Sequence, residues 1–327
     1  MPTSVDTLLM ATRHLHRTGD LFFSEQQGLL KDIVILDMAW LGQDLLGWLH
    51  CPTFMLAAHQ RQDWIRFQRM AAEGPVPLSL IPVPDIVLLP AKASLDVLEH
   101  FAQCYSFEDS ASVDCGCPTM MYVFPSLLKT SKPAHVWTGN DQFNVHIGLK
   151  LSCSDDRTML PAGLFARMQV HLRQEIGPKF SVDVSSRPKA SPIWQGGIWL
   201  SDDVCEAIVV LSSSGSSIYV CVRGDGGQGS QCRSLLSRIQ AVITQHCHMH
   251  SPGLSLLIEY SSASQLKQGI MEADVYSHSQ IEEARRAGSN RVRHSKGFRD
   301  SINSIFGYEE GQGRFDIVFI LCCVVES

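Results

Sequence analysis

The amino-acid sequence predicts an α+β protein, with a winged-helix-like first half followed by an antiparallel sheet with a covering helix. Two observations predict this fold class. Helical patterns dominate the first 130 residues and end in a predicted hairpin, whereas short strands separated by turn residues dominate the chain after residue 133. The content of 45% hydrophobic and 18% charged residues among 327 is typical of a globular chain, so a folded protein is expected.

The first half is predicted to contain four helices and a two-stranded wing. In the helices apolar residues recur every three or four positions, and Gly19, Pro52 and Gly74 follow three of the helix ends. Trp40 and Trp48, eight residues apart, are expected on similar sides of one helix. Five prolines between residues 75 and 90 exclude a regular helix there. The expected elements are helices over residues 6–18, 39–49, 63–72 and 93–104, strands over 21–23 and 33–36, and a hairpin over 105–123.

The second half is predicted to be an antiparallel meander with one long helix. Its strands lie about ten residues apart with turn residues between them. Leu235, Leu236 and Ile239 belong to the helix face that is expected to be buried. On one regular strand, Trp194 and Trp199 would face opposite sides. The expected strands cover residues 135–137, 145–151, 168–172, 193–200, 207–212, 217–222 and 254–260, and the helix covers residues 231–246.

These patterns divide the chain into three parts. Residues 1–130 are predicted to form the winged-helix-like domain, residues 131–265 the α+β domain, and residues 266–327 a connector with a poorly ordered tail. The connector is locally basic, and a solvated surface is the expected role of such a run of charges. An adaptor that binds an acidic partner or a membrane surface through this segment is an alternative. The basic residues are Arg285, Arg286, Arg291, Arg293, Lys296 and Arg299.

Bulk properties exclude several classes of protein. The formal net charge of −6 argues against a general nucleic-acid binder. The first 25 residues lack the apolar core of a signal peptide, and no stretch reaches the roughly 18 consecutive apolar residues that suggest a membrane span. The eleven cysteines are therefore expected to be reduced thiols. We expect a cytoplasmic protein that neither binds nucleic acid nor spans a membrane.

A glycine-rich segment offers one candidate cofactor site. Gly224, Gly226 and Gly229 fit the spacing Gly-x-Gly-x-x-Gly between a predicted strand and a predicted helix, as in dinucleotide-binding sites. Glu259 ends the next strand, but it lies 35 residues after Gly224, where the fingerprint expects an acidic residue after about 20. The upstream strands also do not alternate with helices. A dinucleotide-binding enzyme is therefore the alternative, and a flexible loop is the favoured interpretation.

A histidine-rich helix end offers a candidate metal site. His246, Cys247 and His250 lie within five residues, but zinc sites usually pair such a group with a second cluster. The segment Cys115-x-Cys117 does not have the usual zinc spacing. Histidine near a helix end is also favoured by the helix dipole. No kinase, phosphate-loop, Gly-x-Ser-x-Gly or His-Glu-x-x-His motif is present, so no catalytic residue is predicted.

Several blocks of sequence, in order, carry a resemblance to a known family. They are Leu36-Asp-Met-Ala-Trp-Leu, Val123-Phe-Pro-Ser-Leu-Leu-Lys-Thr, Leu160-Pro-Ala-Gly-Leu-Phe-Ala-Arg-Met-Gln-Val and Ile193-Trp-Gln-Gly-Gly-Ile-Trp-Leu. Together they resemble the COR region (C-terminal of Roc) of death-associated protein kinases within the Roco family. The first block is similar to the family's Leu-Asp-Pro-x-Trp-Leu signature, with Met38 in place of proline, and the third to its Pro-x-Gly-x-Phe-x-x-x-Gln-Val pattern. The signature residues carried over in this way are Leu36, Asp37, Trp40, Leu41, Pro125, Pro161, Gly163, Phe165, Trp194 and Gly197.

The resemblance implies a function that the residues alone do not. COR regions are non-catalytic modules, so the chain would be a regulatory and dimerisation unit, with a first half that contacts a Roc GTPase domain and a second half that pairs with another copy. Signalling in apoptosis would be its setting. The resemblance implies no cofactor for this chain, because GTP and ATP would belong to domains that it lacks. The chain therefore looks like a fragment of a larger kinase-like protein.

Overall fold

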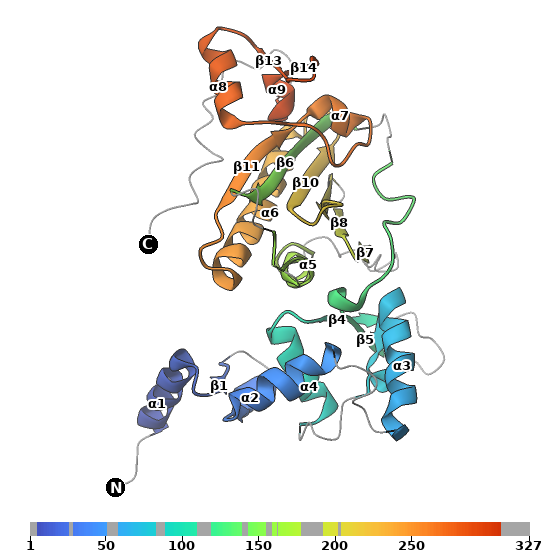
Figure 1. The fold of residues 1–327 in the computed structure, drawn as a ribbon, viewed down its shortest axis with the longest axis vertical. Helices are drawn as coiled ribbons and strands as arrows, with labels where there is room; N and C mark the ends of the chain where they lie inside the picture. The colour runs from blue at the N-terminus through green and yellow to red at the C-terminus, as the bar shows by residue number, and fades with distance from the viewer. Residues whose placement is uncertain are drawn as a thin grey trace. The chain divides into compact units, whose positions relative to one another are not determined.

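The computed structural model divides into two compact units, Met1–Leu128 and Lys129–Ser327. Figure 1 shows the two units along the chain. The predicted boundary after residue 130 differs from this division by two residues. The residues that the structure describes are 5–25, 29–50, 58–82, 89–109, 119–138, 143–154, 159–161, 163–177, 192–201 and 204–308.

The first unit contains helices and two small antiparallel sheets. The predicted helices and strands of this unit are present, and β3 is a strand that the sequence did not indicate. The elements are α1 (Val5–Thr18), β1 (Phe22–Phe23), η1 (Leu29–Asp32), β2 (Val34–Ile35), α2 (Met38–Trp40), η2 (Leu41–Leu46), η3 (Gly47–His50), α3 (Ala58–Glu73), β3 (Val76–Pro77), η5 (Leu78–Leu80), α4 (Ala91–His100), β4 (Tyr105–Asp109), β5 (Thr119–Val123) and η6 (Pro125–Leu127).

The predicted helix over residues 39–49 changes its pitch twice. It begins as α2, widens into the π-helix η2 and tightens into the 3₁₀-helix η3. Trp48 is therefore buried in a cluster with Trp64 and Phe67, whereas Trp40 is partly buried against a separate cluster around Leu41. The two tryptophans do not share one packing face, which corrects the expectation from a regular helix.

A hairpin follows the helices, as the wing prediction requires. Strands β4 and β5 pair in antiparallel register from Tyr105↔Val123 to Asp109↔Thr119. The turn between them lies outside the described residues. Strand β3 extends the hairpin to a three-stranded sheet of order β3-β5-β4. In this sheet Tyr122 is fully buried, so the wing packs into the core of the first unit.

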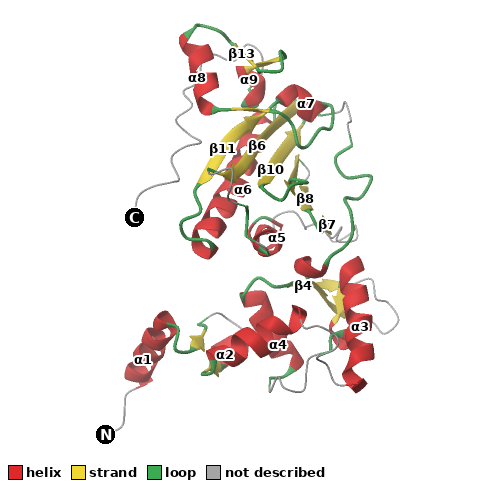
Figure 2. Cartoon of the chain, viewed as in Figure 1, coloured by secondary structure: helices red, strands yellow, loops and turns green. Residues whose placement is uncertain are grey.

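The second unit is built on a seven-stranded sheet of order β12-β11-β6-β10-β9-β8-β7, in which every pair is antiparallel. Figure 2 shows the sheet with its helices. The α+β class is therefore confirmed. The elements are β6 (Val145–Cys153), α5 (Leu164–Glu175), β7 (Ile193–Trp194), β8 (Gly197–Ser201), β9 (Cys205–Leu211), β10 (Ser217–Gly224), α6 (Gly229–His250), β11 (Leu256–Ser261), α7 (Ala263–Lys267), β12 (Val275–Tyr276), α8 (His278–Arg286), β13 (Arg291–Arg293), β14 (Arg299–Ser301) and α9 (Ile302–Ile305).

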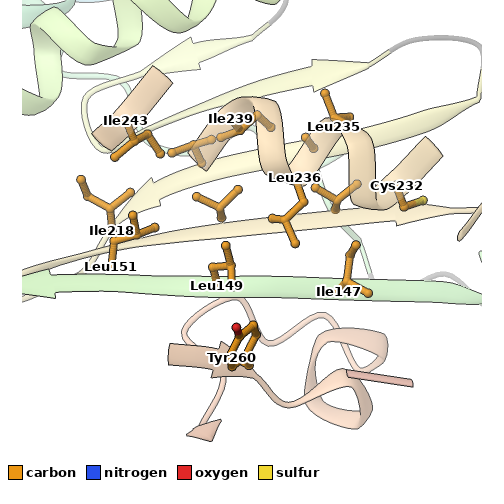
Figure 3. Packing of buried hydrophobic residues seen from close by; sticks show 14 of the residues in the cluster. Ile147, Leu149, Leu151, Ile218, Cys232, Leu235, Leu236, Ile239, Ile243 and Tyr260 are labelled. Carbon is orange, nitrogen blue, oxygen red and sulfur yellow. The ribbon is translucent and has the colours of Figure 1, made fainter. Parts of the chain in front are cut away.

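Both faces of this sheet are covered by the chain. Alternate residues of β10, such as Val220, join the cluster under α5 and α6, and their neighbours, such as Cys221, join a second cluster on the opposite face. Figure 3 shows Leu235, Leu236 and Ile239 of α6 above the first face. Burial on both faces explains the continuous apolar run of β10, because each side of the strand contacts a core.

Three sequence predictions in this unit are wrong. Residues 168–172 are part of helix α5 and not a strand. Residues 135–137 form a turn, whose Val136 and Trp137 pack against the sheet. The strand predicted over residues 193–200 is a hairpin of β7 and β8, so Trp194 and Trp199 pack against the same cluster instead of opposite faces.

The predicted connector is folded as far as residue 308. Strand β12 extends the main sheet, and Tyr276, Ile281 and Phe306 join its hydrophobic core. Asp300 of β14 is 4% exposed and accepts hydrogen bonds from Ser262 Oγ at 2.5 Å and Tyr276 Oη at 3.0 Å. Residues 266–308 therefore fold with the sheet of the second unit, while residues 309–327, where the poorly ordered tail is predicted, lie outside the described residues.

Candidate functional site

In the second unit, the signature residues Trp194 and Gly197 lie in one contact between α5 and the β7–β8 hairpin. Gln169 of α5 is fully buried, and its Nε2 donates to the carbonyl oxygens of Trp194 at 2.9 Å and Gly197 at 2.8 Å. A Cβ atom at Gly197 would lie 2.3 Å from the Trp194 ring. These contacts explain the amide at position 169 and the glycine at 197 by packing.

The other signature residues of α5 shape its beginning. Gly163 precedes α5 with a φ of 76°, in the left-handed region that side chains other than glycine rarely adopt. Phe165 is in the hydrophobic core, whereas Pro161 is exposed. Glycine is therefore required at position 163 by the backbone, while nothing in the structure explains proline at 161.

In the first unit, the signature residues stabilise a helix start. Asp37 caps α2, because its side chain accepts a hydrogen bond of 2.9 Å from the Trp40 backbone N–H. Leu41 is buried and Leu36 is 74% exposed. Pro125 is buried at the first turn of η6. Apart from the exposed Leu36, these residues have roles in helix capping and core packing.

The space beside the glycine loop is filled by other atoms of the protein. A Cβ atom at Gly229 would lie 2.1 Å from the carbonyl oxygen of Gly307, and one at Gly224 would lie 2.7 Å from Cys232 Sγ. Arg233 Nη1 donates to the same Gly307 oxygen at 2.8 Å. This oxygen lies at the beginning of α6, where a dinucleotide's phosphate would have to bind. Gly224 and Gly229 therefore serve close packing.

The topology argues against the dinucleotide site as well. Strand β10 is antiparallel to both of its neighbours, β6 and β9, so the loop does not lie at the carboxyl edge of a parallel sheet. Glu259 lies on β11, where its Oε2 is 3.1 Å from Lys150 Nζ. An ion pair with Lys150 explains this acidic residue without a ribose. The glycine spacing and Glu259, which suggested dinucleotide binding, are therefore both explained by contacts within the protein.

We expect Gly229→Ala to lower the free energy of unfolding by about 2 kcal/mol, because overpacking a close backbone contact forces the chain to shift. Gly226→Ala is the matched control, since a Cβ atom there meets only Asn144 Nδ2 at 3.4 Å. Urea unfolding of both variants measures the difference. Equal stability of Gly229→Ala and wild-type protein would contradict the packing role of the loop.

The candidate metal ligands are only partly brought together. His246 and His250 lie beside each other, with ring centroids 4.4 Å apart, and His171 of α5 joins them. Cys247 is buried in the core, where burial and the nearby Cys153 raise the pKa of its thiol to about 11. Cys247 therefore packs in the hydrophobic core, outside the histidine group. The sequence missed His171, which was assigned to a strand.

Comparison with known families identifies the second unit. The family model "C-terminal of Roc, COR-B domain" matches residues 149–301, which run from β6 to β14. The second unit contains a COR-B domain. The match passes through residue 265, so the COR-B domain includes much of the segment that was predicted to be a connector.

A curated relative supports a COR region. The chain is 23% identical over 240 residues to "Probable serine/threonine-protein kinase pats1" of Dictyostelium discoideum. The aligned part covers 72% of this chain and 7% of that protein, so the chain spans a small fraction of its relative's length. COR-B is a non-catalytic domain, in agreement with the expectation of a regulatory role.

The basic segment forms part of the COR-B domain surface. Strands β13 and β14 pair Arg293 directly with Arg299, and both side chains are exposed with Arg291. Arg285 instead lies 3.6 Å from Glu282, and Lys296 lies 2.5 Å from Asp274. Two of the six basic residues thus have acidic partners. No helix among the described residues is long and apolar enough to cross a membrane.

Proposed function

We propose that the chain is a non-catalytic regulatory and dimerisation module of a Roco-family protein related to death-associated kinases. The COR-B match in a sheet that is buried on both faces is the observation that carries the proposal. In this proposal the first unit contacts a Roc GTPase domain and the second unit pairs with another copy. The nucleotide state of the GTPase would shift the population of the parent protein's conformations by changing those contacts.

An apolar helix face in the first unit supports the contact with a GTPase domain. Helix α1 has no buried residue, and Val5, Leu8 and Leu15 are 82%, 64% and 40% exposed. Their spacing of three and seven residues places them on one face of the helix. An exposed apolar helix face of this kind is suited to a protein partner. We assign this face to the Roc domain of the parent protein.

Leu8→Asp is expected to weaken binding of the parent's Roc domain, added as a separate protein, by about tenfold or more, because it places a charge in an apolar interface. His14→Asp introduces the same side chain at an exposed position off that face, and it should leave the affinity unchanged. Isothermal titration calorimetry with Roc bound to GDP or to a non-hydrolysable GTP analogue measures both. Equal affinity for the wild type and Leu8→Asp would contradict the assignment of this helix.

The pairing of two copies is tested separately by light scattering of the chain over a range of concentrations. A monomer–dimer equilibrium that is indifferent to added nucleotides is the result expected for a COR module without its GTPase domain. A monomer at all concentrations would contradict the dimerisation role. A monomer stabilised by a dinucleotide would instead restore the enzyme alternative.

A further inference from the structure

Three histidines from two helices gather on the side of the sheet that α5 and α6 cover. His171 lies on α5, and His246 and His250 lie one turn apart near the end of α6. One potential ligand nitrogen of each ring lies within 4.8 Å of those of the other two. The ring centroid of His171 lies 4.8 Å from that of His246 and 6.0 Å from that of His250.

The buried member of this group makes no hydrogen bond of normal geometry among the described residues. His246 is 2% exposed, and neither of its ring nitrogens has a hydrogen-bond partner in the part of the chain that the structure describes. Such groups are rare in folded proteins, because a buried polar atom loses its hydrogen bonds to water. The surrounding rings present further nitrogen atoms. A ligand that accepts electron pairs from imidazole would satisfy this nitrogen cluster.

We propose that His171, His246 and His250 bind a zinc ion between α5 and α6. This site goes beyond the regulatory role and does not depend on it. Zinc binds imidazole nitrogen at about 2.0–2.1 Å, so tetrahedral ligands lie about 3.3 Å from each other. The nitrogens already lie within 4.8 Å of one another, and the exposed His250 is the ligand that would move to close the remaining distance.

The donor set favours zinc and leaves one coordination position open. Three imidazole nitrogens suit zinc, copper or nickel, whereas calcium and magnesium prefer oxygen ligands. Cys247 cannot supply sulfur, since it is buried in the core. A zinc ion with three protein ligands keeps its fourth position for water or an exchangeable ligand. The ion would also join the end of α6 to α5.

One charge near the site opposes a cation. Arg167 lies one turn before His171 on α5, and its charge contributes to the lowered pKa of all three histidines. The charge of Glu175, one turn after His171, instead raises the pKa of His171. Arg167→Gln should therefore tighten zinc binding, because it removes the repulsion between the guanidinium and the ion.

The test is a zinc titration of the full chain, without a histidine tag and after dialysis against a chelator. Calorimetry should find one ion per chain, and Co²⁺ should give the strong visible absorption of a tetrahedral site. His171→Ala and His250→Ala should each weaken binding by about 100-fold or more, since each removes a ligand. His248→Ala is the matched control, because His248 is exposed in the same run and lies outside the cluster.

A further variant separates the metal site from a structural role. His246→Leu should abolish zinc binding, and its metal-free form should unfold at no lower temperature than the metal-free wild type, because leucine needs no partner in the buried position. Zinc should raise the unfolding temperature of the wild type but not of this variant. Unchanged affinity in His171→Ala and His250→Ala, or an equal loss in His248→Ala, would overturn the proposal.

Discussion

Replacing Arg223 with methionine is expected to lower the free energy of unfolding by about 3 kcal/mol, because it leaves a partly buried carboxylate without its partner. Arg223 is 5% exposed, and its Nε and Nη2 donate to Glu206 Oε2 at 2.8 Å and 2.7 Å. Its Nη1 donates to the Thr138 carbonyl oxygen at 2.7 Å. The guanidinium carbon lies 4.5 Å from the centre of the Trp137 ring and 4.6 Å from that of Phe143.

These contacts join the segment after the unit boundary to the sheet, so the loss should be a loss of global stability. Arg223→Lys keeps the charge but not the planar group, and it should fall between wild type and methionine. Urea denaturation followed by tryptophan fluorescence measures the three proteins. A methionine variant within about 1 kcal/mol of the wild type would show that the ion pair is replaceable.

Asp300→Ala is expected to lower the free energy of unfolding by about 2–3 kcal/mol, because it leaves buried donors without their charged acceptor. Besides Ser262 and Tyr276, the Ser264 backbone N–H donates to Asp300, at 3.2 Å from Oδ1. Burial first, and then the Asp300 charge, raise the pKa of Tyr276 well above its ordinary value, so its hydroxyl remains a donor. Three segments of the COR-B domain, β14, the start of α7 and β12, therefore depend on one carboxylate.

The location of the damage distinguishes this prediction from a general loss of stability. Hydrogen exchange in Asp300→Ala should quicken first at the amides of β12 and β14, while β6 and β10 in the centre of the sheet remain protected. Asp300→Asn should be intermediate, since an amide keeps one acceptor. Asp225→Ala is the control, because Asp225 is exposed and its hydrogen bonds with Gln228 are made by its backbone N–H and carbonyl oxygen, which alanine keeps. Uniform exchange over the sheet would contradict the local role.

The centre of the second unit could be predicted because its signals are local. Strand β10 is an apolar run bounded by turn residues, and the apolar face of α6 repeats over several turns. The predicted helix over residues 231–246 lies within the observed Gly229–His250. Both elements are long enough for their pattern of apolar residues to distinguish a helix from a strand.

Helix α5 shows where a short window fails. Met168-Gln-Val-His-Leu172 alternates apolar and polar residues as a strand does. A longer window that includes Leu164 and Phe165 shows the helical spacing of the buried residues. This error hid His171 from the metal analysis, because a partner 75 residues from His246 is not visible as a spacing motif.

The fold of residues 266–308 could not be predicted from local patterns. Its elements are short, and its exposed arginines suggested a solvated connector. What holds this part together is the set of distant contacts made by Asp300, Tyr276 and Phe306 with the sheet. Such contacts depend on the tertiary fold. In the sequence, no local pattern around Asp300 indicates that this aspartate is buried.

The strand order of the sheet has a consequence for synthesis on the ribosome. Strand β6 comes first along the chain but lies between β10 and β11, and β11 begins more than a hundred residues after β6 ends. At about 5–20 residues per second, translation leaves this apolar strand without its second neighbour for roughly 5–20 seconds. During that interval β6 has an open edge, so the nascent chain is exposed to edge-to-edge pairing with other chains until β11 has been made.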